Sequence, residues 1–338
     1  MSDLLSSAGS AAGKIGRYFT VVSALPSVVF VCYLFLLVKT GALSGRPSWS
    51  GVVDLAPSDL LTVSLVSFVV ALASHPLQFG LVQFFEGYWG TSAPARWFAL
   101  VRMNHHRRRF LQMDTRLATG LNAIRAADLG PSLAVATPTT IADLIESDEF
   151  SRAVNAYPDD LRWFLPTRLG NVLRRYETAV GVPYGIGILE AAPRLAMVGQ
   201  PREVSYVEDQ RVQLDLAVRT SFLGAVATLL TVFFMWRHGP WLLLGLVPYL
   251  LSYVAYRGSI VIAHEYGTSL AVLVDLNRFE LYDRLRIRQP DSTDDEIANN
   301  EQLMKAFRLH ANVDITYAPW KGTVPETPAN AAEEPTTD

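Results

Sequence analysis

The sequence predicts a mainly α-helical membrane protein, with four transmembrane helices arranged as two hairpins and a helical cytoplasmic domain. Apolar residues are concentrated in four long runs, and the charged residues fill the segments between them. This pattern is typical of membrane spans joined by polar segments. Arginines gather on one side of the runs, and the 338 residues leave room for a soluble domain of about 120 residues.

The first predicted hairpin covers residues 19–90 and follows a flexible cytoplasmic N-terminus, residues 1–18. Its first run, Phe19 to Thr40, is about 22 residues long, enough to cross about 30 Å of hydrocarbon. A signal peptide is the competing interpretation, but the run is long and no small-residue cleavage site follows it, so we expect a retained anchor. The second run, Leu60 to Phe85, follows Pro57-Ser58-Asp59, whose side-chain oxygens we expect to cap the first turn.

The second predicted hairpin covers residues 219–257. Its runs, Thr220 to Trp236 and Trp241 to Tyr256, are near the lower length limit for a span. Arg219 and Arg257 lie at the same end of this hairpin, where we expect both side chains to snorkel to the interface. A re-entrant or surface-lying hairpin is the alternative.

The distribution of basic residues predicts the orientation. Arginines are dense after the second run, whereas the loops on the other side contain only Arg46 and Arg237. The positive-inside rule therefore places both termini and the 91–218 segment in the cytoplasm. The preference for arginine over lysine suggests a bacterial protein of the plasma membrane, and a net charge of -3 gives no reason to expect nucleic acid.

The cytoplasmic helical domain, residues 91–218, contains two basic surfaces. The first belongs to a helix predicted over 95–124, and we expect it to contact anionic lipid headgroups; it consists of His105, His106, Arg107, Arg108 and Arg109. The second is the polar face of a helix whose apolar stripe includes Leu169 and Val172, and it is predicted either to pack on the domain or to bind lipid or an acidic partner. Its residues are Arg168, Asn171, Arg174 and Arg175.

The C-terminal part divides at Pro290. Residues 258–317 are predicted to form cytoplasmic helices, the first continuing the fourth span and the second opening with a capping box of Thr293 and Glu296. Residues 318–338 are rich in Pro, Thr, Ala and Glu, and we expect them to be disordered.

One stretch carries a family resemblance. Residues 165–174 (LPTRLGNVLR), followed by Pro183-Tyr184-Gly185 and Pro193-Arg194-Leu195, resemble a group of actinobacterial multi-pass membrane proteins without an assigned activity. Ala192 stands where that group usually has tryptophan. The likeness covers about residues 165–290, and it implies a shared architecture of membrane hairpins around a cytoplasmic domain.

His75 is the candidate polar site within the membrane. It lies beside Pro76 inside the second run, with Ser74 and Gln78 close by. Polar groups at membrane depth are costly, so an intramembrane histidine indicates function. A neutral histidine that only forms a hydrogen bond inside a kinked helix is the structural alternative.

The sequence contains no recognisable catalytic, nucleotide-binding or metal-binding motif. The single cysteine, Cys32, is expected to pack among helices, and His264-Glu265 lacks zinc-protease spacing. We therefore expect no cofactor, no metal site and no catalytic residues. The first hypothesis is a membrane-anchored interaction or regulatory protein that acts through its cytoplasmic domain, with a protein partner or a second copy of itself.

Two alternatives remain open. One is a homo-oligomeric ion channel or small transporter, whose path the second span would line through Ser67, Ser74, His75 and Gln78. The arrangement of two hairpins around a cytoplasmic domain is similar to that of bestrophin-like channels, although their motifs are absent. The other is a membrane enzyme that acts on lipid at the arginine-rich face.

Overall fold

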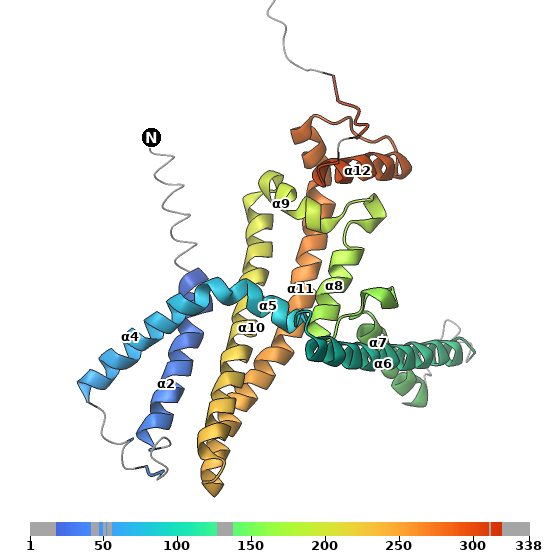
Figure 1. Cartoon of the computed structure of the whole chain (residues 1–338). Coiled ribbons are helices and arrows are strands. Elements are labelled where there is room, and N and C mark those ends of the chain that lie inside the picture. Colours follow the sequence, from blue (N-terminus) through green and yellow to red (C-terminus); the bar gives the residue numbers. More distant parts are fainter. Residues whose placement is uncertain are drawn as a thin grey trace, which may run out of the picture.

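The computed structural model describes residues 18–41, 47–49, 52, 56–126, 138–310 and 312–319, and within them the chain is mainly helical with no strand. Two antiparallel helices, α10 (Pro201–Met235) and α11 (Leu246–Leu285), run the length of the molecule and make its most extensive contact (Figure 1). The short 3-10 helix η7 (Gly239–Gly245) precedes α11. The prediction that the fourth span continues as a helix beyond its apolar run is confirmed.

Small residues allow α10 and α11 to approach closely. A Cβ added at Gly224 would lie 2.9 Å from the carbonyl oxygen of Pro248 on α11. One turn away, the Ser252 hydroxyl donates to the carbonyl oxygen of Ser221 at 2.7 Å. Such small and hydroxyl-bearing side chains let transmembrane helices pack backbone to backbone.

The first hairpin packs against one end of this pair. It consists of the π-helix η1 (Phe19–Ala24), α2 (Leu25–Lys39) and α4 (Pro57–Ser74), and α2 lies between α10 and α4. Lys39 Nζ lies 2.9 Å from the Asp59 carboxylate and links the two helices. The expected cap is wrong in detail: Ala56 is the N-cap residue, and Asp59 accepts its backbone N–H at 3.0 Å.

Four of the described helices are long and apolar enough to cross a membrane: Phe19–Lys39, Pro57–Glu86, Pro201–Met235 and Gly239–Leu285. Their outward side chains are apolar, and α4 exposes a nearly continuous set that includes Leu61, Leu65, Phe68 and Leu72. A surface of this kind is stable only in contact with lipid or another apolar surface. The chain is therefore a membrane protein. Cys32, expected among packed helices, instead lies exposed on α2.

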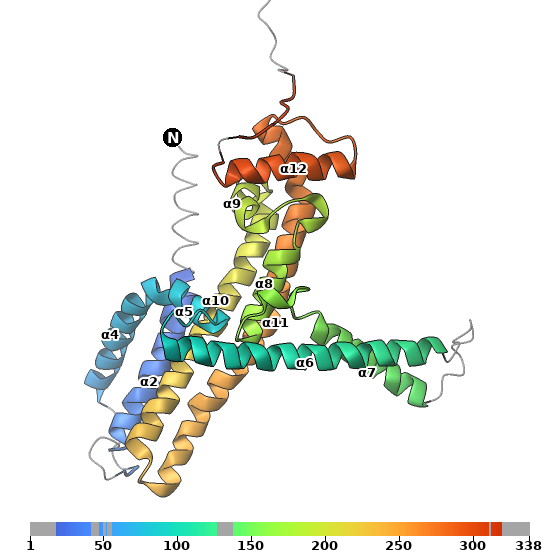
Figure 2. The same cartoon turned by 45° about the vertical axis from the view of Figure 1, so that its right-hand side comes forward.

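The chain changes direction after α4. A 3-10 turn, η3 (His75–Leu77), leads into α5 (Gln78–Glu86), which crosses α10 and reaches α8 (Figure 1). The long helix α6 (Ala93–Ala126) and its partner α7 (Pro138–Val154) then run crosswise to α10 and α11 (Figure 2). The sequence predicted α6 within two residues at each end but gave no prediction for α7.

The end of α10 and α11 that lies away from the first hairpin forms the polar half of the molecule. Three helices pack there: α8 (Arg168–Ala179), α9 (Ile188–Val198) and α12 (Thr293–Phe307), with the 3-10 helix η6 (Val182–Tyr184) between the first two. The predicted apolar stripe of α8 is confirmed, because Leu169 and Val172 are fully buried. Another 3-10 helix, η5 (Leu161–Trp163), precedes α8.

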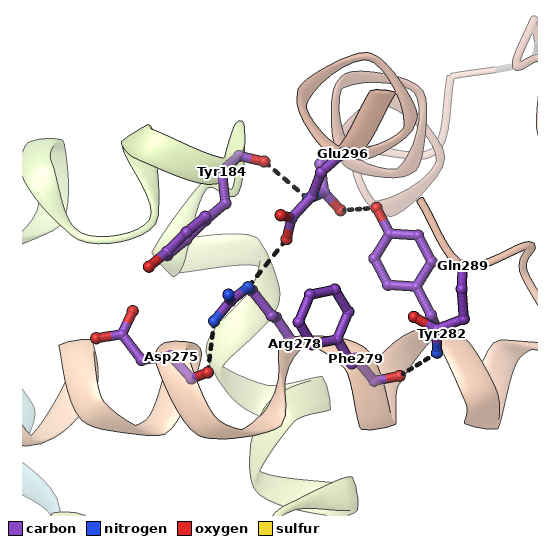
Figure 3. Close-up of polar contacts among 8 residues, drawn as sticks. Tyr184, Asp275, Arg278, Phe279, Tyr282, Gln289 and Glu296 are labelled. Atoms are coloured by element: carbon purple, nitrogen blue, oxygen red, sulfur yellow. Dashed lines mark hydrogen bonds and ion pairs between the residues drawn. The ribbon is translucent and has the colours of Figure 1, made fainter. Parts of the chain in front are cut away.

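The start of α12 corrects the predicted capping box. Ser292 is the N-cap residue, and its hydroxyl accepts the N–H of Asp295 at 3.2 Å. Glu296 is buried and accepts from Arg278 of α11 at 3.0 Å (Figure 3). The guanidinium of Arg278 lies 4.1 Å from the ring centroid of Tyr184, so Glu296 fixes α12 to α11 and η6 instead of capping its own helix.

Candidate functional site

Polar side chains from η1, the α4–α5 bend and α10 meet where the apolar half of the molecule gives way to the polar half. We call this group the polar junction. Its members are Tyr18, Ser23, Ser74, His75, Gln78, Asp215 and Arg219.

Arg219 is the centre of the polar junction. Its side chain is fully buried, its Nε donates to Gln78 Oε1 at 2.9 Å, and its Nη2 donates to the carbonyl oxygen of Ser74 at 3.0 Å. The sequence predicted a snorkelling arginine at this position, and that prediction is wrong. The guanidinium turns toward the bend of the second span because unpaired acceptors are available there.

One of the two acceptors, the carbonyl of Ser74, is freed by Pro76. Proline has no N–H and disrupts the regular hydrogen bonding of the helix. Through η3 each backbone hydrogen bond spans three residues instead of four. The N–H of His75 donates to the carbonyl of Leu72, and the N–H of Gln78 donates to the carbonyl of His75. The carbonyl of Ser74 thereby loses its usual donor, the N–H of Gln78, and accepts from Arg219.

Two further contacts extend the polar junction to the start of the first span. The Tyr18 hydroxyl donates to Asp215 Oδ2 at 2.7 Å, and the Ser23 hydroxyl lies 3.1 Å from His75 Nδ1. The Nε2 of Gln78 also donates to the backbone carbonyl of Asp215 at 3.1 Å. The polar junction thus ties the first three spans together at one level.

A cavity of about 580 Å³ opens beside the polar junction. Its walls come from α5, α8, α9, α10 and α11, so it borders both halves of the molecule. His75, Gln78 and Asp215 belong to the polar junction and also line this junction cavity. A volume in this range is typical of small-molecule sites.

The charged groups in the walls of the junction cavity are mostly acidic. Three carboxylates, those of Glu86, Glu177 and Asp215, line it beside one guanidinium, that of Arg211. Burial raises the pKa of Glu177, while Arg174, 3.2 Å away, opposes this shift. Four Tyr and Phe side chains also line the cavity, namely Tyr18, Phe79, Tyr176 and Tyr266.

The basic cluster of α6 is divided between several environments. His106 is buried and its Nδ1 lies 3.0 Å from the Tyr157 hydroxyl, while Arg107 donates to the carbonyl of Leu161 at 3.2 Å. Burial, and then the charges of neighbouring arginines, lower the pKa of His106 to about 4, so this imidazole is neutral near pH 7. His105, Arg108 and Arg109 remain exposed.

The polar face predicted for α8 also separates into different roles. Asn171 is fully buried and forms three hydrogen bonds of 2.7 to 2.8 Å with the backbone of Leu165 and Thr167, so it shapes the turn before α8 and offers no accessible surface. Arg174 contacts the hydroxyl of Tyr88 as well as Glu177. Arg168 and Arg175 lie partly exposed.

The sequence identified His75, Ser74 and Gln78 but missed their partners. Asp215 and Arg219 are four residues apart in the sequence just before the third apolar run, so opposite charges at helical spacing were visible as a signal. Glu86 and Glu177 had no such signal, because a fold is needed to bring them together.

Among the described residues, no group of three or more His, Cys, Asp or Glu side chains is placed to hold a metal ion. Comparison of the chain with family models, curated proteins and solved structures gives no match.

Proposed function

We propose that this chain is a membrane-anchored regulatory protein of a bacterial plasma membrane, with both termini and the polar half in the cytoplasm. In this proposal the junction cavity binds a small amphiphilic organic cation, and its occupancy changes the surface that the polar half presents to a protein partner. The observation that carries the proposal is the acidic and aromatic lining of a cavity that borders both halves.

The orientation is supported by the basic residues. α6 and the start of α8 carry most of the arginines near the apolar spans, whereas the η7 turn carries only Arg237 nearby. In a Cys32→Ser background, we expect Arg237→Cys to react with an impermeant maleimide on intact cells. Gln289→Cys is expected to react only after lysis. The reverse pattern would overturn the orientation.

The ligand class follows from the walls of the junction cavity. Glu177 and Asp215 lie close to the guanidinium groups of Arg174 and Arg219, so Glu86 is the lining carboxylate that we expect to meet a cation. A cation gains further from aromatic faces at short range. The remaining wall is largely aliphatic, from Val82, Leu173, Ile188 and Leu270. A molecule with one positive charge and an apolar body matches both the acidic and aromatic wall and the aliphatic wall.

Continuous helices support the proposal that ligand binding in the junction cavity changes the polar half. α10 and α11 line the junction cavity and extend beyond it, and α9 lines it while also packing against α12. A ligand that displaces α9 therefore acts on the helix that Arg278 and Glu296 hold in place. This route supports regulation through the face of α12.

Tetraphenylphosphonium is a suitable probe, because tetraphenylborate has the same shape and the opposite charge. We expect purified protein in detergent to bind the phosphonium ion saturably, and tetraphenylborate to leave this binding undisplaced. Glu86→Gln is expected to weaken it about ten-fold, which corresponds to about 1.4 kcal/mol. Equilibrium dialysis measures the affinity of the wild type and of the variant for the phosphonium ion.

Glu280→Gln is the matched control, because Glu280 is an exposed carboxylate of α11 outside the cavity lining. It is expected to bind the phosphonium ion as the wild type does. Equal binding of both probe ions, or equal losses in the two variants, would contradict a cation site in the junction cavity.

A small transporter or channel is the second candidate, favoured by the contact of the cavity with His75 and Asp215 at the end of the spans. Ser67 and Gln78, proposed above to line a path, are both buried within the chain. If the protein transports a solute, we therefore expect the solute to pass through a single chain by way of the junction cavity. Flux of the phosphonium ion in proteoliposomes, absent from His75→Ala, would favour transport over regulation.

A further inference from the structure

A second cavity, of about 390 Å³, lies where α8 begins beside α11. We call it the basic notch. Its lining combines two arginines with aliphatic residues and a glycine: Arg168, Val254, Arg257, Gly258, Ile260 and Val261. It shares no lining residue with the junction cavity.

Positive charge is concentrated at the basic notch without a matching carboxylate. Arg168 and Arg257 line the same cavity. Burial lowers the pKa of Arg168; Tyr157 opposes this shift, and the charges of Arg109 and Arg257 add to it. Among the described residues, no carboxylate forms an ion pair with any of these three arginines. Arg168 is partly buried and Arg109 and Arg257 are exposed, so a ligand can reach these guanidinium groups, which favour an anion that carries several acceptor oxygens.

The depth of Arg257 matches the edge of a bilayer. η7 and the first dozen residues of α11 together rise about 30 Å, from Gly239 at the turn between the third and fourth spans to Arg257. The hydrocarbon core of a bilayer is also about 30 Å thick. Arg257 and the basic notch therefore lie at headgroup level on the side of the polar half.

An apolar stripe on α11 leads from the basic notch into the spans. Val247, Leu250, Leu251 and Val254 recur at spacings of three and four, and the same face continues through Gly258 to Val261. All five of the large residues are exposed. Val247 and Leu251 also line an apolar cavity of about 220 Å³ between α2, α10 and α11, which offers room for hydrocarbon.

We propose that the basic notch is a specific site for an anionic phospholipid of the leaflet on the side of the polar half. Arg168 and Arg257 bind the phosphate, and an acyl chain lies along the α11 stripe. The inference is independent of the ligand proposed for the junction cavity. It also replaces the broad lipid-binding face expected from the sequence with one site, of which Arg168 is a member and Arg174 is not.

Gly258 allows a test that leaves the arginines in place. A Cβ at this position would meet no atom within 4 Å, so there is room for a side chain, and Gly258→Leu is designed to fill the basic notch. Gly80→Leu is the matched control, because Gly80 is also helical with nothing within 4 Å and lies on α5. A double Arg168→Gln, Arg257→Gln variant removes the charge.

Native mass spectrometry of the detergent-solubilised protein measures retention of added phosphatidylglycerol and phosphatidylcholine, and thermal unfolding measures the stabilisation by each lipid. We expect phosphatidylglycerol to be retained and to raise the Tm, with little effect from phosphatidylcholine. Gly258→Leu is expected to abolish that retention and Gly80→Leu to preserve it. Each arginine removed is expected to weaken binding about five-fold.

Three results would overturn the lipid site. They are equal effects of the two lipids on the wild-type protein, retention of phosphatidylglycerol by Gly258→Leu, and protection by inorganic phosphate alone that equals the protection by phosphatidylglycerol. The last result would assign the basic notch to a soluble anion.

Discussion

Asp215→Leu is expected to lower the free energy of unfolding by about 1 to 3 kcal/mol, because the buried Arg219 guanidinium loses a nearby negative charge and the Tyr18 hydroxyl loses its acceptor. Asp215 is the carboxylate whose charge acts on the buried Arg219, four residues away on α10. Removing it leaves the guanidinium with only the neutral acceptors Gln78 and Ser74. Arg219→Met is expected to cost a similar amount, because it leaves the Asp215 carboxylate with Tyr18 alone.

The double variant Asp215→Leu, Arg219→Met distinguishes this explanation from simple loss of packing. Removing both charges removes the uncompensated one, so the double variant is expected to be more stable than either single variant. Unfolding by sodium dodecyl sulfate in mixed micelles, followed by circular dichroism, gives all three values. Arg202→Met, at an exposed position of the same helix, is the control and is expected to change little.

Losses that simply add in the double variant would contradict a coupled pair at the polar junction. Single variants as stable as the wild type would show that the junction is solvated and carries no desolvated charge. The cation proposal for the junction cavity is tested separately, because Glu86 does not belong to this pair.

The long elements were predictable because each is determined by local pattern. The apolar runs and the flanking arginines predict the spans, and the stripe of Leu169 and Val172 predicts α8, since burial of one helix face follows directly from spacing. α12 was also predicted, but its cap was misplaced by one residue. Ser292 and Thr293 are both residue types that cap helices. Which of them is the N-cap depends on the tertiary contact between Glu296 and Arg278, which prevents Glu296 from capping its own helix.

The site was predictable only in part because its partners meet through the fold. Pro76 signals a bend, but nothing local says which donor reaches the carbonyl of Ser74. Arg219 stands at the end of an apolar run, where snorkelling is the usual outcome, and only the position of the α4–α5 bend turns it inward. The basic notch likewise joins Arg168 and Arg257, which are far apart in the sequence.

Gly170→Ala is expected to destabilise the protein by about 1 to 3 kcal/mol, the range for overpacked interiors, although alanine is the better helix former. A Cβ at Gly170 would lie 2.0 Å from the backbone carbonyl oxygen of Glu86. Backbone atoms cannot rotate away, so α5 and α8 must separate. The Thr167 hydroxyl, which donates to the same carbonyl at 2.9 Å, would lose its partner.

The same substitution at Gly80 isolates the steric cause. Gly80 lies on α5, where a Cβ meets nothing within 4 Å, so Gly80→Ala is expected to stabilise the helix by up to about 1 kcal/mol. Opposite signs in the two variants, measured by the same detergent unfolding, would show that α5 and α8 are in backbone contact. Because Glu86 and Glu177 line the junction cavity from these two helices, Gly170→Ala should also weaken phosphonium binding, whereas Gly80→Ala should leave it unchanged.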